Sequence, residues 1–260
     1  MFRGTQEGFQ PLSAMCQFFV DGLYKHVRFA SWFIKFRKLF IYTPREEFIK
    51  ETMECIAITR LEGDYLEFGV FQGRTFVPAY HFAQRNDLKS MRFYGFDSFE
   101  GLPAIEGNDE GGEFSEGQYS LSLNHFTKLI SNRGVRLDKV NLVKGWYDKV
   151  LNGDTKKHLS IKNAAFIFID CDLYESTVPV LNFITEYLQS GTIIAFDDWY
   201  CFKGSPEKGE QKAFKEWLQK NPSFKALEFH KFGWSGNLFI MHHQRSESNE
   251  EFEGPSSTSR

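Results

Sequence analysis

Residues 65–75 read Tyr65-Leu66-Glu67-Phe68-Gly69-Val70-Phe71-Gln72-Gly73-Arg74-Thr75, an apolar run that leads through two glycines into a new segment. This order predicts a β-strand, a tight turn and the start of a helix. In α/β sheets, ligands bind beyond the carboxyl ends of the strands, and the turn after the first strand often contributes to binding. Gly69 and Gly73 have no Cβ, so the backbone of this turn can pass close to a ligand.

The alternation of short apolar runs and helical segments continues to about residue 243. The predicted strands are residues 65–68, 93–96, 140–143, 165–169, 192–196 and 238–242, with a further candidate at 225–231. The predicted helices between them are residues 75–84, 121–132, 178–188 and 210–219. Strands that alternate with helices are typical of an α/β fold whose mainly parallel sheet is covered on both faces.

Before the first strand, residues 12–60 have apolar side chains at helical spacing. Thr43 and Pro44, followed by acids, predict a helix start with Thr43 as the cap, in a helix that ends near Arg60. We therefore divide the chain into a helical extension at 1–60, a ligand-binding α/β domain at 61–243 and a polar tail at 244–260, which we expect to be disordered. The extension is a candidate lid or a contact in a homo-oligomer.

The composition excludes several classes of protein. The 260 residues are 42% hydrophobic and 25% charged, which fits one large globular domain with a smaller accessory element. The net charge of −3 gives no electrostatic reason to expect a nucleic-acid partner. The 4 cysteines form no CxxC pair, so a zinc site is not expected and a cytoplasmic location fits. Charged residues interrupt the apolar stretch 29–42, so we expect no transmembrane segment, and no signal peptide is apparent.

Two acids indicate which ligand the glycine turn would hold. Glu67 would repel a pyrophosphate, but a carboxylate at this point suits a cationic ligand. The turn alone is equally compatible with no ligand at all. Asp97 ends the second predicted strand, where an acid can accept hydrogen bonds from both hydroxyls of a ribose. Together the two acids favour S-adenosyl-L-methionine (adenosylmethionine below). Trp146, after the third strand, either stacks on the adenine or belongs to the core.

Four aspartates follow two neighbouring strands of the predicted sheet. Asp170 and Asp172 follow residues 165–169, and Asp197 and Asp198 follow residues 192–196. Carboxylates that converge raise each other's pKa unless a cation neutralises them. Oxygen ligands without sulfur or imidazole favour Mg²⁺, with Mn²⁺ or Ca²⁺ as alternatives. Some of these acids are also suited to cap helices, and Asp170-Cys171-Asp172 matches the D-x-D pattern of nucleotide-sugar glycosyltransferases.

Several motifs, in order over roughly residues 60–240, resemble the macrocin-type sugar O-methyltransferases of macrolide and aminocoumarin biosynthesis. The shared stretches are Glu67-Phe68-Gly69-Val70, Phe96-Asp97-Ser98-Phe99-Glu100-Gly101-Leu102-Pro103, Gly145-Trp146-Tyr147, Asp170-x-Asp172-Leu173-Tyr174-x-Ser176-Thr177 and Asp197-Asp198-Trp199. The resemblance implies a Rossmann-like class I methyltransferase fold. It also implies a Mg²⁺-dependent transfer of a methyl group from adenosylmethionine to a hydroxyl, often one of a vicinal pair on a sugar.

The resemblance also assigns roles to individual residues. It implies Asp170, Asp197 and Asp198 as metal ligands and Asp172 as the general base, although the division between Asp170 and Asp172 stays open. The candidate cofactor-binding residues are Glu67, Gly69, Val70, Gly73, Thr75, Asp97, Ser98 and Trp146. Arg74 departs from the family pattern, because many relatives have a second glycine after Gly73. The acceptor is expected to be a small molecule that carries a hydroxyl, such as a sugar or glycoside.

Three hypotheses follow from the sequence. The first is the metal-dependent O-methyltransferase, the second is a glycosyltransferase that uses the D-x-D pattern, and the third is a binding protein that has the fold without catalysis. The glycine-rich, acidic residues 105–117 are either a mobile lid over the acceptor or an ordinary surface loop.

Overall fold

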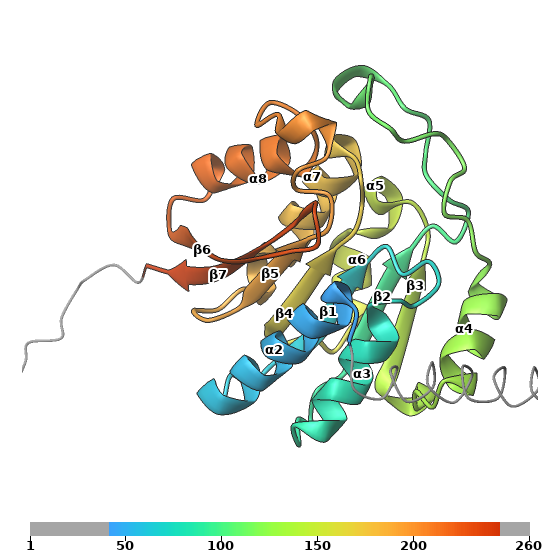
Figure 1. The fold of residues 1–260 in the computed structure, drawn as a ribbon, viewed down its shortest axis with the longest axis vertical. Helices are drawn as coiled ribbons and strands as arrows, with labels where there is room; N and C mark the ends of the chain where they lie inside the picture. Colours follow the sequence, from blue (N-terminus) through green and yellow to red (C-terminus); the bar gives the residue numbers. More distant parts are fainter. Residues whose placement is uncertain (1–41, 245–260) are drawn as a thin grey trace, which may run out of the picture. The chain divides into compact units, whose positions relative to one another are not determined.

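The structure is a computed structural model that describes residues 42–244. Its centre is a seven-stranded sheet of order β3-β2-β1-β4-β5-β7-β6 (Figure 1). The strands are β1 Asp64–Phe68, β2 Phe93–Asp97, β3 Val140–Lys144, β4 Ala164–Ile169, β5 Ile193–Phe196, β6 Phe224–Phe232 and β7 Gly236–His243. The pairs among β1 to β5 are parallel, whereas β7 runs antiparallel to β5 and β6. The predicted mainly parallel sheet is confirmed.

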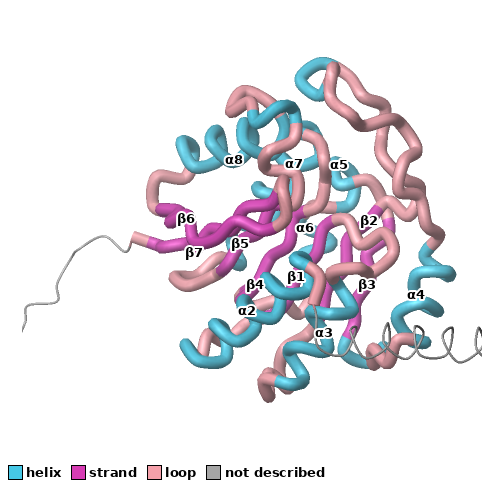
Figure 2. Tube along the Cα trace, in the orientation of Figure 1, coloured by secondary structure: helices cyan, strands magenta, loops and turns pink. Residues whose placement is uncertain are grey.

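Helices cover both faces of this sheet (Figure 2). They are α2 Pro44–Thr59, α3 Phe76–Arg85, α4 Leu123–Asn132, α5 Tyr147–Val150, α6 Gly153–His158, α7 Tyr174–Ile184 and α8 Gly209–Lys220. On one face, Phe48 of α2 stacks on Phe168 of β4 with ring centroids 5.8 Å apart. On the other face, Phe183 of α7 meets Phe68 of β1 edge-on at 6.3 Å. No helix within residues 42–244 is long and apolar enough to cross a membrane.

The alternation of side chains along β1 explains why this strand is buried on both faces. Leu66 and Phe68 point into the apolar cluster beneath α7 and α8. Tyr65 points to the opposite face, where its ring lies 5.9 Å from Phe76 of α3. Because side chains alternate with a period of two, Glu67 is on the same face as Tyr65. Burial on both faces is what a parallel sheet with helices on each side requires, and it places a carboxylate inside the protein.

The structure also corrects details of the predicted elements. The helix predicted at 178–188 begins at Tyr174, and the short helices α5 and α6 were not predicted. The earlier start arises because Asp109, distant in sequence, accepts hydrogen bonds from the backbone N–H groups of Tyr174 at 2.6 Å and Glu175 at 3.1 Å. The expected helix at 44–60 is confirmed as α2. Most of the predicted extension and nearly all of the tail lie outside the described residues.

Candidate active site

A cavity of about 630 Å³ opens at the carboxyl ends of the parallel strands. All four aspartates line it, and so does every predicted cofactor-binding residue except one. The exception is Gly73, which is buried, with φ +63°, beside Ile130, Phe126 and Val77. A Cβ at Gly73 would lie 3.4 Å from each of these side chains, an ordinary contact, so the positive φ of the turn is what favours glycine here.

Gly69 is needed for a close approach inside the protein. Its φ is +89°, and a Cβ would lie 1.9 Å from the carbonyl oxygen of Asp170. The turn after β1 therefore packs directly on the residue that follows β4. Only glycine fits this position, so the turn is fixed against the segment that carries the aspartates.

Asp97 holds the turns after β1 and β2 together. Its Oδ2 accepts hydrogen bonds from the backbone N–H groups of Val70 at 2.9 Å and Phe71 at 3.3 Å. Its Oδ1 accepts one from the N–H of Phe99 at 2.6 Å. Burial raises the pKa of Asp97, and these N–H donors oppose that rise. The carboxylate thus organises the cavity wall from the position predicted to bind a ribose.

Glu67 is 1% exposed and accepts a hydrogen bond from the Tyr65 hydroxyl at 2.5 Å. Burial raises the pKa of Glu67 well above its usual value, against the opposing effects of Tyr65 and the positive charge of Arg45. A buried acid at the wall of a cavity can stabilise a bound cation, because the ion pair forms in a region of low dielectric.

Thr75, Ser98 and Trp146 form further parts of the wall. Thr75 precedes α3, and its side chain makes no capping hydrogen bond with that helix. The Ser98 hydroxyl donates to the carbonyl of Gly101 at 2.8 Å and accepts from the N–H of Glu100 at 3.0 Å, so it shapes the loop after β2. Trp146 precedes α5 and is partly exposed to the cavity.

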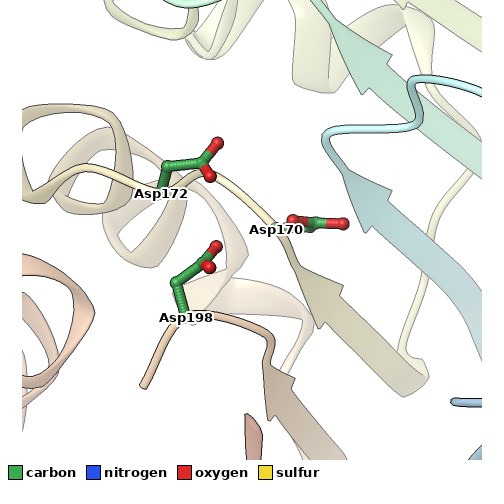
Figure 3. A group of neighbouring side chains, drawn as sticks. All are labelled: Asp170, Asp172 and Asp198. Atoms are coloured by element: carbon green, nitrogen blue, oxygen red, sulfur yellow. The ribbon is translucent and has the colours of Figure 1, made fainter. Parts of the chain in front are cut away.

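Three of the four aspartates come together. Carboxylate oxygens of Asp170, Asp172 and Asp198 lie within 4.8 Å of one another, where the segments after β4 and β5 meet (Figure 3). Oδ2 of Asp198 is buried and has no hydrogen-bond partner among the described residues. Burial and then repulsion from neighbouring carboxylates raise the pKa of Asp170 and Asp172 well above the usual value, and they raise the pKa of Asp198 to about 7. The cluster therefore needs a cation or protons.

Asp197 has a different partner, Arg45. The Arg45 guanidinium donates through Nη2 to Oδ2 of Asp197 and through Nη1 to Oδ2 of Asp170 at 3.5 Å. In the structure, Asp172 thus lies with Asp170 and Asp198. The resemblance instead implied Asp197, together with Asp170 and Asp198, as a metal ligand. Sequence reasoning missed Arg45, because the stretch from Thr43 to Glu47 was interpreted only as a helix start. An arginine in the first turn of a helix, where acids are favoured, was the available signal.

Glu210 of α8 was also missed. It is 1% exposed, and its Oε2 accepts a hydrogen bond from the backbone N–H of Asp198 at 3.0 Å. Its Oε1 is buried without a partner among residues 42–244. Burial, together with the charge of Asp198, raises the pKa of Glu210 well above its usual value. A local signal was available, because Glu210 lies at helical i, i+3, i+4 and i+7 spacing with the apolar residues Ala213, Phe214 and Trp217, which form the buried face of α8.

We expect the metal-free protein to lose stability as the pH rises from about 4 to about 7. In this window, between the ordinary Asp value of 3.8 and about 7, folded Asp198 binds a proton that unfolded Asp198 has released. The free energy of unfolding therefore decreases with pH. Chemical denaturation in EDTA at several pH values would measure a slope that Asp198→Asn makes less negative. If the free energy of unfolding depended on pH equally in both proteins, the raised pKa assigned to Asp198 would be contradicted.

Residues 105–117, predicted as a lid or a surface loop, are held against α7 and α8. Besides the cap that Asp109 provides, Lys212 of α8 donates to the Asn108 side chain at 2.7 Å. The rings of Phe114 and Phe202 lie 5.7 Å apart. At the end of this loop, Tyr119 lines the cavity and meets Phe71 edge-on at 5.5 Å. The loop thus connects the cavity wall to the start of α7, next to Asp172.

Replacing Asp109 with alanine is expected to destabilise the protein by about 1–2 kcal/mol, because α7 loses its side-chain cap. The N-cap residue Leu173 makes no side-chain hydrogen bond that could replace it. Urea denaturation would measure the loss, and Glu106→Ala, at an exposed residue of the same loop, is the matched control. Equal stability of the two variants would show that the contact contributes nothing.

The fold and the cavity together define a class of protein. A mainly parallel sheet of order β3-β2-β1-β4-β5-β7-β6, with antiparallel β7, is the Rossmann-like fold of class I adenosylmethionine-dependent methyltransferases. The O-methyltransferase NovP superimposes with a TM-score of 0.64 at 20% identity, covering 77% of this chain and 80% of that one. The calicheamicin methyltransferase CalS11 superimposes with a TM-score of 0.67 at 20% identity, covering 91% and 99%. The predicted fold class is confirmed.

The chain belongs to the macrocin-O-methyltransferase (TylF) family, whose model matches residues 38–220. It is 28% identical over 153 residues to mycinamicin III 3''-O-methyltransferase of Micromonospora griseorubida, which covers 56% of this chain and 58% of the relative. It is 24% identical over 164 residues to demethyldecarbamoylnovobiocin O-methyltransferase of Streptomyces niveus, with 60% of each covered. The matches thus span less than two thirds of the length of these relatives. Membership in this family favours the methyltransferase hypothesis over the glycosyltransferase.

Proposed function

We propose that this protein transfers a methyl group from adenosylmethionine to a hydroxyl of a sugar or a sugar-bearing small molecule. The observation that carries the proposal is the single cavity that joins the turn after β1 to the aspartate cluster after β4 and β5. One part of it suits a cationic adenosine ligand, and the other suits a hydroxyl that must lose a proton. A relative from Streptomyces olivaceus, 24% identical over 153 residues, is named for a 4'-O-methylation of a compound with a rhamnosyl group, and this supports a sugar as acceptor.

For the methyl donor, we assign the adenosine end to Asp97 and Trp146. Asp97 has two oxygens at the cavity wall, and a carboxylate can accept more hydrogen bonds than the three it makes with the backbone. Trp146 offers an aromatic face for the adenine. Glu67 lies deeper, and a bound sulfonium or ammonium group would stabilise its charged form against the burial that raises its pKa. Gly69, Val70, Gly73, Thr75 and Ser98 shape the wall around these groups.

For the acceptor end, we propose a divalent cation, with Mg²⁺ the first choice, bound by Asp170, Asp197 and Asp198, with Asp172 beside them. The donors fit, because they are all oxygens, Asp170 and Asp198 lie with Asp172 within 4.8 Å, and Oδ2 of Asp198 is buried without a partner among residues 42–244. A bound cation would lower the pKa of a hydroxyl that coordinates it, and two adjacent hydroxyls would suit it best.

Asp172 is the proposed general base. It is 6% exposed, and burial beside Asp198 raises its pKa well above the usual value, which strengthens a carboxylate as a proton acceptor. In the reaction, the acceptor oxygen forms a bond to the methyl carbon while the bond from that carbon to sulfur breaks. The hydroxyl proton passes to Asp172, and the sulfur leaves as a neutral thioether. The cavity walls contribute by aligning the two reactants.

The experiment is a methyl-transfer assay with isotopically labelled adenosylmethionine and a panel of free sugars, nucleotide-linked sugars and glycosides, with Mg²⁺ or with EDTA. We expect transfer to at least one sugar hydroxyl and loss of that transfer in EDTA. Calorimetry would measure the binding of adenosylmethionine independently of methyl transfer. Binding of the donor without transfer to any acceptor would favour a non-catalytic binding protein, and transfer at full rate in EDTA would refute the metal.

A further inference from the structure

The cavity wall is strongly acidic, yet adenosylmethionine has an anionic group. Its amino-acid end has an ammonium and a carboxylate on the same carbon atom. Glu67 suits the ammonium and the sulfonium, but this acid and the other acids of the wall, Asp97 and Asp170, would repel the carboxylate. If this ligand binds here, as proposed above, a cation on the wall must compensate for that repulsion.

Among the described residues, the basic side chains of the wall are Arg45, Arg74 and Lys149. Arg74 is exposed and donates to the Gln72 side chain at 3.3 Å. Lys149 is exposed and pairs with Asp148 at 2.8 Å, beside Trp146 and thus at the proposed adenine end. Arg45 is half-buried, and it alone of the three contacts Asp170 and Asp197. It also interacts with the charge of Glu67, the acid proposed for the ammonium and sulfonium.

The contacts of Arg45 place its guanidinium between an acid and a hydroxyl. Nη1 lies 3.5 Å from Oδ2 of Asp170 and 3.4 Å from the Thr75 hydroxyl oxygen. Thr75 is 1% exposed, precedes α3 and makes no capping bond with that helix. The ammonium and carboxylate of an amino acid are adjacent, so their binding groups must be adjacent as well. Glu67, whose charge acts on Arg45, and Thr75, which Arg45 contacts, meet this requirement.

We propose that Arg45, together with the Thr75 hydroxyl, binds the carboxylate of the amino-acid end of the methyl donor. Contacts with described residues engage at most three of the five N–H donors of the guanidinium. The remaining donors suit a carboxylate, which arginine binds with two parallel hydrogen bonds. Because Arg45 belongs to α2, this assignment makes that helix part of the donor site and gives a function to a residue outside the glycine turn.

The test compares two ligands that differ only in the carboxylate: adenosylmethionine and decarboxylated adenosylmethionine, which keeps the ammonium and the sulfonium. Calorimetry with the full chain at fixed Mg²⁺ would measure both affinities for the wild type and for Arg45→Met. We expect Arg45→Met to bind adenosylmethionine at least about tenfold more weakly and the decarboxylated ligand within about threefold of the wild type. Arg45→Lys should recover part of the loss. Arg136→Met, at an exposed arginine outside the cavity that pairs with Asp138, should change neither affinity.

Arg45→Met leaves Asp197 without its partner and can therefore destabilise the fold. The double variant Arg45→Met with Asp197→Asn removes both charges of this pair and should show the same selective loss. Equal weakening of both ligands, or no weakening of either, would overturn the assignment of Arg45 while leaving the proposed function intact. A wild-type protein that binds neither ligand would instead overturn the proposed function, and this inference with it.

Discussion

Asp198→Asn is expected to reduce methyl transfer by about 10³-fold or more and to abolish the binding of Mn²⁺, used as a probe for the divalent cation. The side chain keeps its shape, but the cluster loses one of three carboxylates that lie within 4.8 Å. The Asn amide also replaces the carboxylate whose buried Oδ2 has no hydrogen-bond partner within residues 42–244. Calorimetric titration with Mn²⁺ and the methyl-transfer assay would measure the two effects.

The matched control for Asp198→Asn is Asp148→Asn. Asp148 also lines the cavity, but it is exposed and pairs with Lys149 away from the cluster. Its replacement should leave Mn²⁺ affinity and the rate of methyl transfer within about twofold of the wild type, because exposed ion pairs contribute little. Transfer by Asp198→Asn at the wild-type rate would refute the proposed role of the cluster.

Asp97→Ala should weaken the binding of adenosylmethionine by about 100-fold or more and leave the binding of Mn²⁺ within about threefold. The variant loses an acceptor for the ribose and also frees the backbone N–H groups of Val70, Phe71 and Phe99. Calorimetry with each ligand would separate the two effects. A loss of Mn²⁺ binding as large as the loss of donor binding would show that Asp97 supports the whole cavity rather than the donor end.

The variant Asp97→Asn separates two roles of Asp97: binding the ribose and holding the turns after β1 and β2. The amide oxygen can still accept from the N–H groups of Val70 and Phe71, but the amide NH2 group then faces the N–H of Phe99, which loses its acceptor. We expect a loss of thermal stability smaller than that of Asp97→Ala and donor binding intermediate between the wild type and Asp97→Ala. Full donor affinity in Asp97→Asn would indicate that the acid serves only the turns.

The sequence was sufficient for the architecture because each strand and its neighbouring helix are local patterns. The apolar run at 65–68 and the glycine turn after it gave β1 within one residue of its observed start. The start of α7 was placed too late, because its cap is Asp109, which lies 65 positions before Tyr174. No pattern around Tyr174 contains that information.

The aspartate cluster was also predictable, for a topological reason. Carboxyl ends of adjacent parallel strands meet at one edge of a sheet, and the pairing of β4 with β5 brings Asp170 and Asp198 together. The predicted division of roles was less certain, because the strand order does not fix which way each side chain points. Asp172 has a left-handed backbone with φ 63°, and this turn brings it to the other two.

The sequence by itself therefore determined the strands, the cavity edge and the residues that carry the acidic charge, since apolar periodicity depends on neighbours along the chain, whereas the strand order β3-β2-β1-β4-β5-β7-β6 pairs strands that are distant in it. Only the tertiary structure revealed the partners of those charges. Arg45 lies 152 positions from Asp197, and Glu210 of α8 reaches the backbone of Asp198. Such pairs form because a buried charge is stable only beside an opposite charge or a hydrogen-bond donor. The packing of α2 and α8 on the sheet decides which groups come close enough.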